Sequence, residues 1–300
     1  MSGAGANAPR FCLRGRLLRW LGQALARLSP QRTQRLGRWL SRVPGLNASR
    51  RRIAARNIEA CFAALPPDAR TRLLARALAS NTTGALDTLR GWFAPGRLDG
   101  LARVRGLEHL HAALAAGRGA VVVGAHYDGI EIAMRLVAEA SGQAMPILVR
   151  RYNDPCLERE IDAGRRRYCG HTYDKKDVAG FVEAVRAGQA AFYVPDQNAN
   201  RRTVFVPFHG VRTATLGAIG GVIARTGGAP LMMWCRRGDD GRYDIDLEPP
   251  PPGWPGPDEA GNAARYMAWI EERLREDPAQ YLWVHRRFKT RPPGEPPFYR

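Results

Sequence analysis

The pattern of apolar residues changes from a continuous run to a helical repeat within one short segment, Ala120-Val-Val-Val-Gly-Ala-His-Tyr-Asp-Gly-Ile-Glu131. Its first four residues are apolar and mostly β-branched, which is typical of a buried strand, and glycines bracket the turn that follows. From Glu131 onward the apolar residues recur with helical period. The segment therefore predicts a strand, a turn and a helix, with His126 at the carboxyl end of the strand. That is where α/β proteins usually carry their functional groups.

A histidine and a glutamate in this segment suit acid–base chemistry. Histidine titrates near neutral pH, so His126 is suited to accept a proton from a hydroxyl group, and Glu131 is suited to hold the ring in one tautomer. The spacing also fits a second interpretation. In that interpretation Asp128 and Glu131 form a capping box at the start of the helix, and His126 is a hydrogen-bonded turn residue. Spacing alone leaves both interpretations open.

Short apolar runs alternate with segments of helical period along much of the chain. Strands are expected near Ala120, Ile147, Phe192, Val204, Leu231 and Tyr243. Helices are expected before about Leu89 and over residues 107–116, 178–187, 215–225 and 262–275. This alternation predicts an α/β fold with a mixed central sheet flanked by helices.

The N-terminal part carries charge of one sign. No Asp or Glu precedes Glu59, whereas the arginines before it are Arg10, Arg14, Arg16, Arg19, Arg27, Arg32, Arg35, Arg38, Arg42, Arg50, Arg51, Arg52 and Arg56. Apolar residues, among them Trp20 and Trp39, recur between them at helical spacing, as in helices that lie in a membrane interface. We expect membrane-associating basic amphipathic helices over residues 1–56 and a catalytic domain over residues 57–300. The alternative is that these helices pack on the domain and expose an ordinary basic face.

The cysteines and the hydropathy bear on the compartment. Cys12, Cys61, Cys156, Cys169 and Cys235 form no Cys-x-x-Cys pair, and their odd count and scatter suit a reducing compartment. Cys169 and His171 lie close in the sequence without making a convincing zinc site. No uncharged apolar run reaches the roughly 18 residues of a spanning helix, and no clean signal-peptide core is present.

Further blocks follow the histidine in a fixed order. They are Tyr193-Val-Pro-Asp-Gln-Asn198, then Val204-Phe-Val-Pro-Phe-His-Gly-Val211, and finally Gln280-Tyr-Leu-Trp-Val-His-Arg-Arg-Phe-Lys-Thr-Arg-Pro292; upstream stand Asn57, Cys61 and Phe62. With these blocks the chain resembles the late acyltransferases of lipid A biosynthesis, lauroyl and myristoyl transferases of the lysophospholipid acyltransferase superfamily. Their mark is His-x4-Glu, and the resemblance covers roughly residues 50 to 292.

The resemblance implies a glycerolipid-acyltransferase-like fold and transfer of a fatty acyl chain from an acyl thioester, normally acyl carrier protein, to a hydroxyl of a lipid A precursor. No acyl-enzyme, cofactor or metal is expected. His126 would take the hydroxyl proton and Glu131 would orient its ring. Arg150, or the adjacent Arg151, and Asp196 are the expected substrate-binding residues. Taken without the resemblance, Arg150 also fits a surface cation at a strand end, and Asp196 fits an Asx turn after a proline.

Departures from the family pattern concern the acceptor. His209 replaces a usual aromatic residue, Asn198 stands where Asp is common, and residues 164–170 are more basic than the usual connection. His209 fits either a second functional histidine or a satisfied structural one. The departures leave open a related reaction on another acceptor, such as a lysophospholipid or other amphiphile.

The charge indicates anionic partners. The net charge of +18 comes almost entirely from arginine, whose planar guanidinium suits phosphate groups. We expect acyl carrier protein, an anionic membrane surface and the lipid acceptor as partners, and a peripheral location on the cytoplasmic face of the cell inner membrane. Charge alone also fits a non-enzymatic nucleic-acid or membrane-coat protein. No nucleic-acid-binding module is visible, so we expect no nucleic-acid partner.

Overall fold

The computed structural model describes residues 12–299. The helices are α1 (Leu13–Ala26), α2 (Pro30–Ser41), α3 (Ala48–Cys61), α4 (Pro67–Phe93), α5 (Leu107–Ala115), α6 (Ile130–Ser141), α7 (Pro155–Cys169), α8 (Val178–Arg186), α9 (Ile219–Thr226), α10 (Glu259–Leu274) and the short 3-10 helix η1 (Pro278–Gln280). The strands are β1 (Ala102–Arg105), β2 (Ala120–Val123), β3 (Ile147–Val149), β4 (Thr172–Asp174), β5 (Ala190–Tyr193), β6 (Thr203–Phe208), β7 (Val211–Leu216), β8 (Ala229–Arg237) and β9 (Tyr243–Glu248).

A mixed sheet forms the centre of the molecule. Within residues 12–299 it has seven strands in the order β1-β9-β8-β2-β5-β3-β4, and β6 and β7 pair separately as an antiparallel hairpin. Strands β8, β2, β5, β3 and β4 run parallel, and β9 is antiparallel to β8. The parallel strands therefore end at one edge, which we call the carboxyl edge. Strand β2 lies in the middle of the sheet, and its side chains are fully buried.

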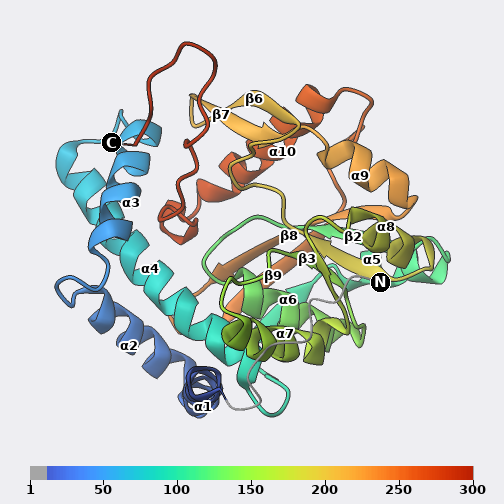
Figure 1. Ribbon diagram of the computed structural model, residues 1–300, viewed down its shortest axis with the longest axis horizontal. Helices are drawn as coiled ribbons and strands as arrows, with labels where there is room; N and C mark the ends of the chain where they lie inside the picture. The colour runs from blue at the N-terminus through green and yellow to red at the C-terminus, as the bar shows by residue number, and fades with distance from the viewer. Residues whose placement is uncertain (1–11, 300) are drawn as a thin grey trace.

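Helices cover both faces of the sheet (Figure 1). Helices α6 and α7 pack against each other and against α4 on one side, while α9 contacts α8 and α10 on the other. The β6–β7 hairpin lies against α10, and its turn reaches the end of α3. These layers confirm the predicted α/β fold with a mixed sheet, because buried parallel strands need apolar helices on both faces.

Helices α1, α2 and α3 pack along α4, as the blue and cyan part of Figure 1 shows. The contacts are close: a Cβ added to Gly37 of α2 would lie 2.1 Å from Oγ1 of Thr83, and one added to Gly22 of α1 would lie 2.6 Å from the carbonyl oxygen of Leu89. The expected boundary after residue 56 falls inside α3. Arg10 and the rest of residues 1–11 lie outside the described part of the chain.

Most predicted elements are present, with differences at short strands. The predicted helix over 215–225 begins only at Ile219, because residues 211–216 form β7. Strands β1 and β4 were not predicted, because Ala102-Arg-Val-Arg105 and Thr172-Tyr-Asp174 lack the apolar runs of the predicted strands of equal length. Among residues 12–299, no helix is both long enough and apolar enough to cross a bilayer.

Two of the cysteines are paired in the structure. Cys12 and Cys156 form a disulfide, although 144 positions separate them in the chain. Cys61, Cys169 and Cys235 are free. The scatter of cysteines in the sequence does not reveal the pair, because folding brings the start of α1 beside the start of α7.

Candidate active site

His126 lies at the carboxyl edge, directly after β2 and before α6. Its backbone carbonyl accepts a hydrogen bond from the amide of Leu282 at 3.0 Å, and Tyr127 forms a bridge with Tyr281. The hydroxyl of Tyr266 donates to the carbonyl of Gly124 at 2.5 Å. The turn that carries the histidine is therefore held by the segment after η1 and by α10, so the imidazole has a defined position.

Asp196 is the carboxylate that meets the imidazole. It follows β5, the strand next to β2, so both side chains emerge at neighbouring positions of the carboxyl edge. Its Oδ1 lies 2.5 Å from Nδ1 of His126, and its Oδ2 accepts hydrogen bonds from the His126 amide at 3.0 Å and from the Tyr281 hydroxyl at 3.1 Å. The Asp196 side chain is 1% exposed, whereas that of His126 is 26% exposed.

The electrostatics of the pair favour an ionised aspartate. Burial by itself raises the pKa of Asp196, but the charge of His126 and two hydrogen bonds from that residue outweigh burial, so the pKa lies below its usual value. An ionised Asp196 accepts the Nδ1 proton, which assigns the lone pair of the neutral ring to Nε2. In this geometry the oxygens of Asp196 accept hydrogen bonds from His126 and Tyr281, and its expected contact with substrate stays a prediction.

Glu131 has partners other than the histidine. It lies in the first turn of α6, and its carboxylate accepts hydrogen bonds from the guanidinium of Arg165, from Nε1 of Trp92 at 2.8 Å and from the hydroxyl of Tyr168 at 3.2 Å. Burial raises the pKa of Glu131, but the charge and hydrogen bonds of Arg165 outweigh it and keep the pKa low. The guanidinium of Arg165 also lies over the Trp92 ring, 5.0 Å from its centroid.

This geometry corrects the expected pairing of Glu131 with His126. A helix that begins at Ile130 directs its first-turn side chain toward α4 and α7, and the sheet brings Asp196 to the ring instead. Glu131 ties the start of α6 to both neighbouring helices. The capping-box interpretation is also wrong, since the N-cap of α6 is Gly129 and makes no side-chain cap.

Asp128 anchors the same turn to α4. Its amide donates to the carbonyl of Gln280 at 2.8 Å, and its Oδ1 accepts from Nδ2 of Asn81 at 3.2 Å. A Cβ added to Gly84 would lie 2.2 Å from the Asp128 carbonyl oxygen, so α4 contacts the turn backbone directly. Burial raises the pKa of Asp128 to about 7, although the charge of Arg237 and the Asn81 hydrogen bond act in the opposite direction.

Arg150 and Arg151 follow β3 at the carboxyl edge but differ in surroundings. Arg151 donates to Glu158 at 2.9 Å, to Asp162 at 2.5 Å and to the carbonyl of Thr172 at 2.9 Å. These bonds hold its guanidinium against α7 and β4, and its expected contact with substrate stays a prediction. Arg150 is exposed at the strand end. Of the two, Arg150 is therefore the one available to an incoming anion.

His285 is a neighbour of the site that sequence reasoning did not single out. Its Nε2 accepts a hydrogen bond from the amide of Asn198 at 3.3 Å, and its carbonyl accepts from the buried Asn57 side chain at 2.8 Å. Burial, followed by the positive charge of His126, lowers the pKa of His285 to about 4, while Asp196 acts in the opposite direction. His285 therefore stays neutral at physiological pH. The sequence feature that could have identified His285 is its place in the closing block, Gln280 to Pro292.

The blocks that carried the resemblance meet around the histidine. Asn198 donates to Oγ1 of Thr290 at 3.0 Å and accepts from the Thr290 amide at 2.8 Å, so it joins the second block to the closing block. An aspartate at this position could make the first contact only with the direction reversed, by accepting from the Thr290 hydroxyl. The buried Arg287 donates to the carbonyl of Ala214 at 2.7 Å and so joins the closing block to β7.

His209 has a structural setting. It occupies the turn between β6 and β7 at a φ of 47°, and its ring packs on Phe62 at 4.9 Å and on Trp283 at 6.1 Å between centroids. Burial lowers the pKa of His209 to about 4. These contacts favour the structural interpretation of this histidine. Within residues 12–299, no group of three His, Cys, Asp or Glu side chains is arranged to hold a metal ion.

A half-buried histidine held by a buried aspartate lies at the carboxyl edge of a mixed α/β sheet, an arrangement suited to acid–base chemistry. Comparisons with known proteins identify the family of the chain. A family model described as bacterial lipid A biosynthesis acyltransferase matches residues 13–290.

Individual relatives agree with the family model. The lipid A biosynthesis lauroyltransferase of Escherichia coli (strain K12) is 33% identical over 255 residues, which are 83% of this chain and 82% of the relative. The palmitoleoyltransferase of the same strain is 32% identical over an equal length, and its myristoyltransferase is 28% identical over 269 residues, which are 87% of this chain and 81% of the relative. The chain belongs to the bacterial lipid A biosynthesis acyltransferase family.

Proposed function

We propose that the protein transfers a fatty acyl chain from acyl carrier protein to a hydroxyl group of a lipid A precursor. Family membership and the names of the relatives support acyl transfer in lipid A biosynthesis. The observation that carries the chemistry is the His126–Asp196 pair at the carboxyl edge. A hydroxyl is a weak nucleophile at neutral pH, and removal of its proton as it attacks is what such a pair supplies.

His126 is the catalytic base of the proposed reaction. Its Nε2 takes the proton of the acceptor hydroxyl while the hydroxyl oxygen attacks the thioester carbonyl carbon. The tetrahedral intermediate then collapses, the carbon–sulfur bond breaks and the thiol leaves with the proton from Nε2. The products are an ester and free thiol, so protons and electrons balance without an acyl-enzyme. Asp196 is a positioning residue that fixes the tautomer and stabilises the imidazolium as it forms.

Glu131 and Arg150 have supporting roles in this proposal. Glu131 is a positioning residue, because its bonds to Trp92, Arg165 and Tyr168 set the start of α6 and with it the end of the His126 turn. Arg150 is exposed at the same edge, and an arginine there suits a phosphate of the acceptor.

The N-terminal helices support attachment to a membrane interface. Leu13, Leu17 and Trp20 of α1 and Trp39 of α2 are 60% to 69% exposed. Large apolar side chains are costly to leave in water, and basic residues on the same helices attract anionic headgroups by about 1 kcal/mol each. We propose a peripheral protein on the cytoplasmic face of the cell inner membrane, with residues 1–56 as the membrane-associating part.

Acyl transfer from labelled acyl carrier protein tests the proposal. The acceptors are a Kdo-bearing tetra-acylated lipid A precursor and, separately, a lysophospholipid. We expect product with the lipid A precursor and a loss of about 100-fold or more in His126→Ala. His209→Phe is the matched control, because it removes a histidine that packs among aromatic rings outside the pair. Product only with the lysophospholipid would show that the protein transfers acyl chains to a different acceptor. No product with either acceptor would refute the proposed activity.

A further inference from the structure

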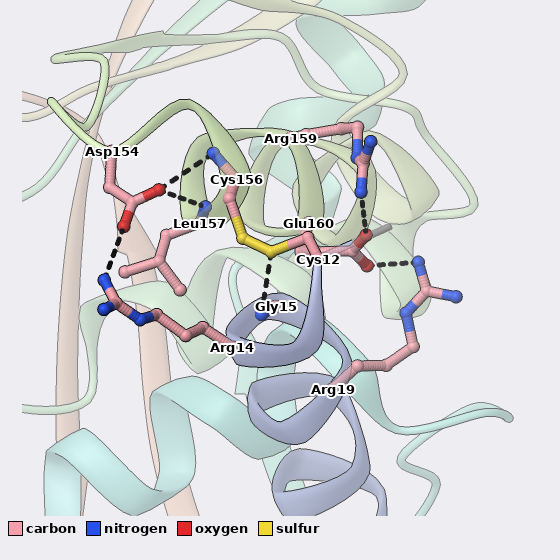
Figure 2. Close-up of a disulfide and its surroundings, with 9 residues drawn as sticks. All are labelled: Cys12, Arg14, Gly15, Arg19, Asp154, Cys156, Leu157, Arg159 and Glu160. Carbon is pink, nitrogen blue, oxygen red and sulfur yellow. Dashed lines mark hydrogen bonds and ion pairs between the residues drawn. A yellow bond between two sulfur atoms is a disulfide. The ribbon is translucent and has the colours of Figure 1, made fainter. Parts of the chain in front are cut away.

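The disulfide between Cys12 and Cys156 joins two distant parts of the chain (Figure 2). Cys12 is the N-cap of α1, and its sulfur accepts a hydrogen bond from the amide of Gly15 at 3.2 Å. Cys156 lies in the first turn of α7, and the two Cα atoms are 5.9 Å apart. We call this bond the α1–α7 disulfide.

Close packing surrounds the α1–α7 disulfide. A Cβ added to Gly15 would lie 2.5 Å from Cγ of Glu160 and 3.3 Å from the carbonyl oxygen of Cys156, so a larger residue does not fit there. Arg14 lies 3.7 Å from Asp154, the N-cap of α7, and Arg19 pairs with the buried Glu160. Figure 2 shows both ion pairs flanking the disulfide. Shape and charge therefore bring the two cysteines together independently of the bond between them.

The two joined helices have different surroundings: α1 carries an exposed apolar face, and α7 supports the candidate active site. The outer side of α1 exposes Leu13, Leu17 and Trp20, which follow the helical repeat. Helix α7 carries Arg165 and Tyr168, which hold Glu131 beside the candidate active site. A bond at the start of both helices thus connects the apolar outer face of α1 to the helix that supports the site.

A permanent disulfide is unusual at the cytoplasmic face of the membrane, where we propose that the protein lies, whereas a reversible one is expected there. Thiol buffers keep most cysteines reduced on the cytoplasmic side of a membrane, and disulfides that do form there are usually transient or redox-sensing. Cys156 is half-buried and Cys12 is buried, so Cys156 is the more accessible residue of the pair and we assign the attack to its sulfur. Cys12 is then the leaving group, and α1 is the element that its release affects.

We propose that Cys12 and Cys156 form a reversible redox tether that fixes α1 to α7 when oxidised and releases the N-terminal half of α1 when reduced. In reduction, one thiolate of a small dithiol attacks the Cys156 sulfur, the sulfur–sulfur bond breaks, and Cys12 leaves as a thiolate and takes up a proton. The second thiol of the reductant attacks the mixed disulfide and frees Cys156. The dithiol loses two electrons and two protons, and the cysteines gain them. A low-molecular-weight disulfide reverses the reaction.

Release weakens the attachment of the N-terminal half of α1, because the Gly15 packing and the ion pairs of Arg14 and Arg19 then act without a covalent bond. Gly22 packs on Leu89 and Phe93 of α4 and holds the C-terminal half of α1 whether or not the disulfide is present. The exposed stripe from Leu13 to Trp20 lies in the half next to the tether. When this stripe enters lipid, the tether keeps α1 on α7; without it, lipid insertion competes with the α1–α7 contact. The expected effect of this release on acyl transfer to a membrane-bound acceptor rests on the proposed function.

The test compares the full-length protein after treatment with oxidised glutathione and after treatment with dithiothreitol. Non-reducing peptide mapping measures the Cys12–Cys156 linkage, and hydrogen–deuterium exchange measures the opening of α1. We expect the linked peptide only after oxidation, exchange at residues 13–19 at least about tenfold slower in the oxidised protein, and a melting temperature about 5 °C higher. The Cys12→Ser, Cys156→Ser double variant should match reduced wild type under both treatments.

Cys61→Ser is the matched control, because it removes a free cysteine outside the tether and should keep the full redox response. Absence of the linked peptide, or an equal dithiothreitol response in the double variant, would overturn the tether. Acyl transfer to acceptor in vesicles of phosphatidylethanolamine and phosphatidylglycerol should fall at least threefold on reduction of wild type. Equal transfer in both states would overturn the functional coupling. No transfer in either state would count against the proposed function, and the tether would still be decided by mapping and exchange.

Discussion

Replacement of Asp196 by asparagine tests whether Asp196, in place of the Glu131 expected from the sequence, is the carboxylate partner of His126. Asparagine keeps the size of the side chain but removes its charge. Its oxygen can still accept from the His126 amide and the Tyr281 hydroxyl, which leaves its amide nitrogen facing Nδ1. An amide donor there requires Nδ1 to be the acceptor and places the ring proton on Nε2. The imidazole then cannot take a proton from the hydroxyl.

The size of the effect follows from the charge that develops during the reaction. At an effective dielectric of about 20, two unit charges roughly 4 Å apart interact by about 4 kcal/mol. Loss of that stabilisation from the forming imidazolium corresponds to about three orders of magnitude in rate, since about 1.4 kcal/mol is a factor of ten. We expect Asp196→Asn to lower the single-turnover rate of acyl transfer by about 1000-fold, with little change in melting temperature.

Glu131→Gln is the matched comparison. It keeps acceptors for Trp92 and Tyr168 but leaves the buried Arg165 without its counter-charge, which costs about 3–5 kcal/mol of folding stability. We expect a lower melting temperature and, at temperatures where the variant is folded, less than a tenfold change in rate. A 1000-fold loss in Glu131→Gln at unchanged melting temperature, together with more than a tenth of wild-type rate in Asp196→Asn, would refute the assigned roles.

Three further changes test the surroundings of the site. His285→Ala should lower the transfer rate about tenfold and His285→Gln less, because glutamine can still accept from the Asn198 amide; equal losses in a rate assay would argue against that hydrogen bond. Burial raises the pKa of Asp128 to about 7, so the folded state favours its protonated form and loses stability as the pH rises from about 4 through 7. Asp128→Asn should remove that loss, so in denaturant titrations the variant should be more stable than wild type at pH 8 but not at pH 4. If the free energies of unfolding of the two proteins changed equally with pH, the assigned role of Asp128 would be excluded. Gly84→Ala places a Cβ 2.2 Å from the Asp128 carbonyl oxygen and should cost about 1–3 kcal/mol, measured by the same titrations, with an unchanged stability contradicting the close contact.

The site combines a fixed base with a supporting framework that is spread over the whole chain. The His126 turn is held by Asp128 against α4, by Leu282 after η1 and by Glu131 through α7. Because these contacts come from separate elements, damage to any of them should reach the base through its position rather than its chemistry. This explains why blocks near both ends of the chain were needed for the resemblance.

Local sequence determined the element that carries the chemistry. The β-branched run before Gly124 and the helical period after Ile130 each depend on neighbours within a few residues, so the strand, the turn and the position of His126 could be predicted. The apolar, arginine-rich face of α1 was predictable for the same reason. Strand β4 was not, since Thr172-Tyr-Asp174 is as short as β3 but lacks its apolar run.

Tertiary structure decided which groups face one another. Glu131 is five positions from His126 but starts a helix that directs it to Arg165, whereas Asp196, 70 positions away, meets the ring because β5 lies beside β2 in the sheet. Strand order is a non-local property that periodicity does not contain. The same holds for Cys12 and Cys156, which are brought together only when α1 packs on α7. The sequence determined the chemical groups available, and long-range packing determined their partners.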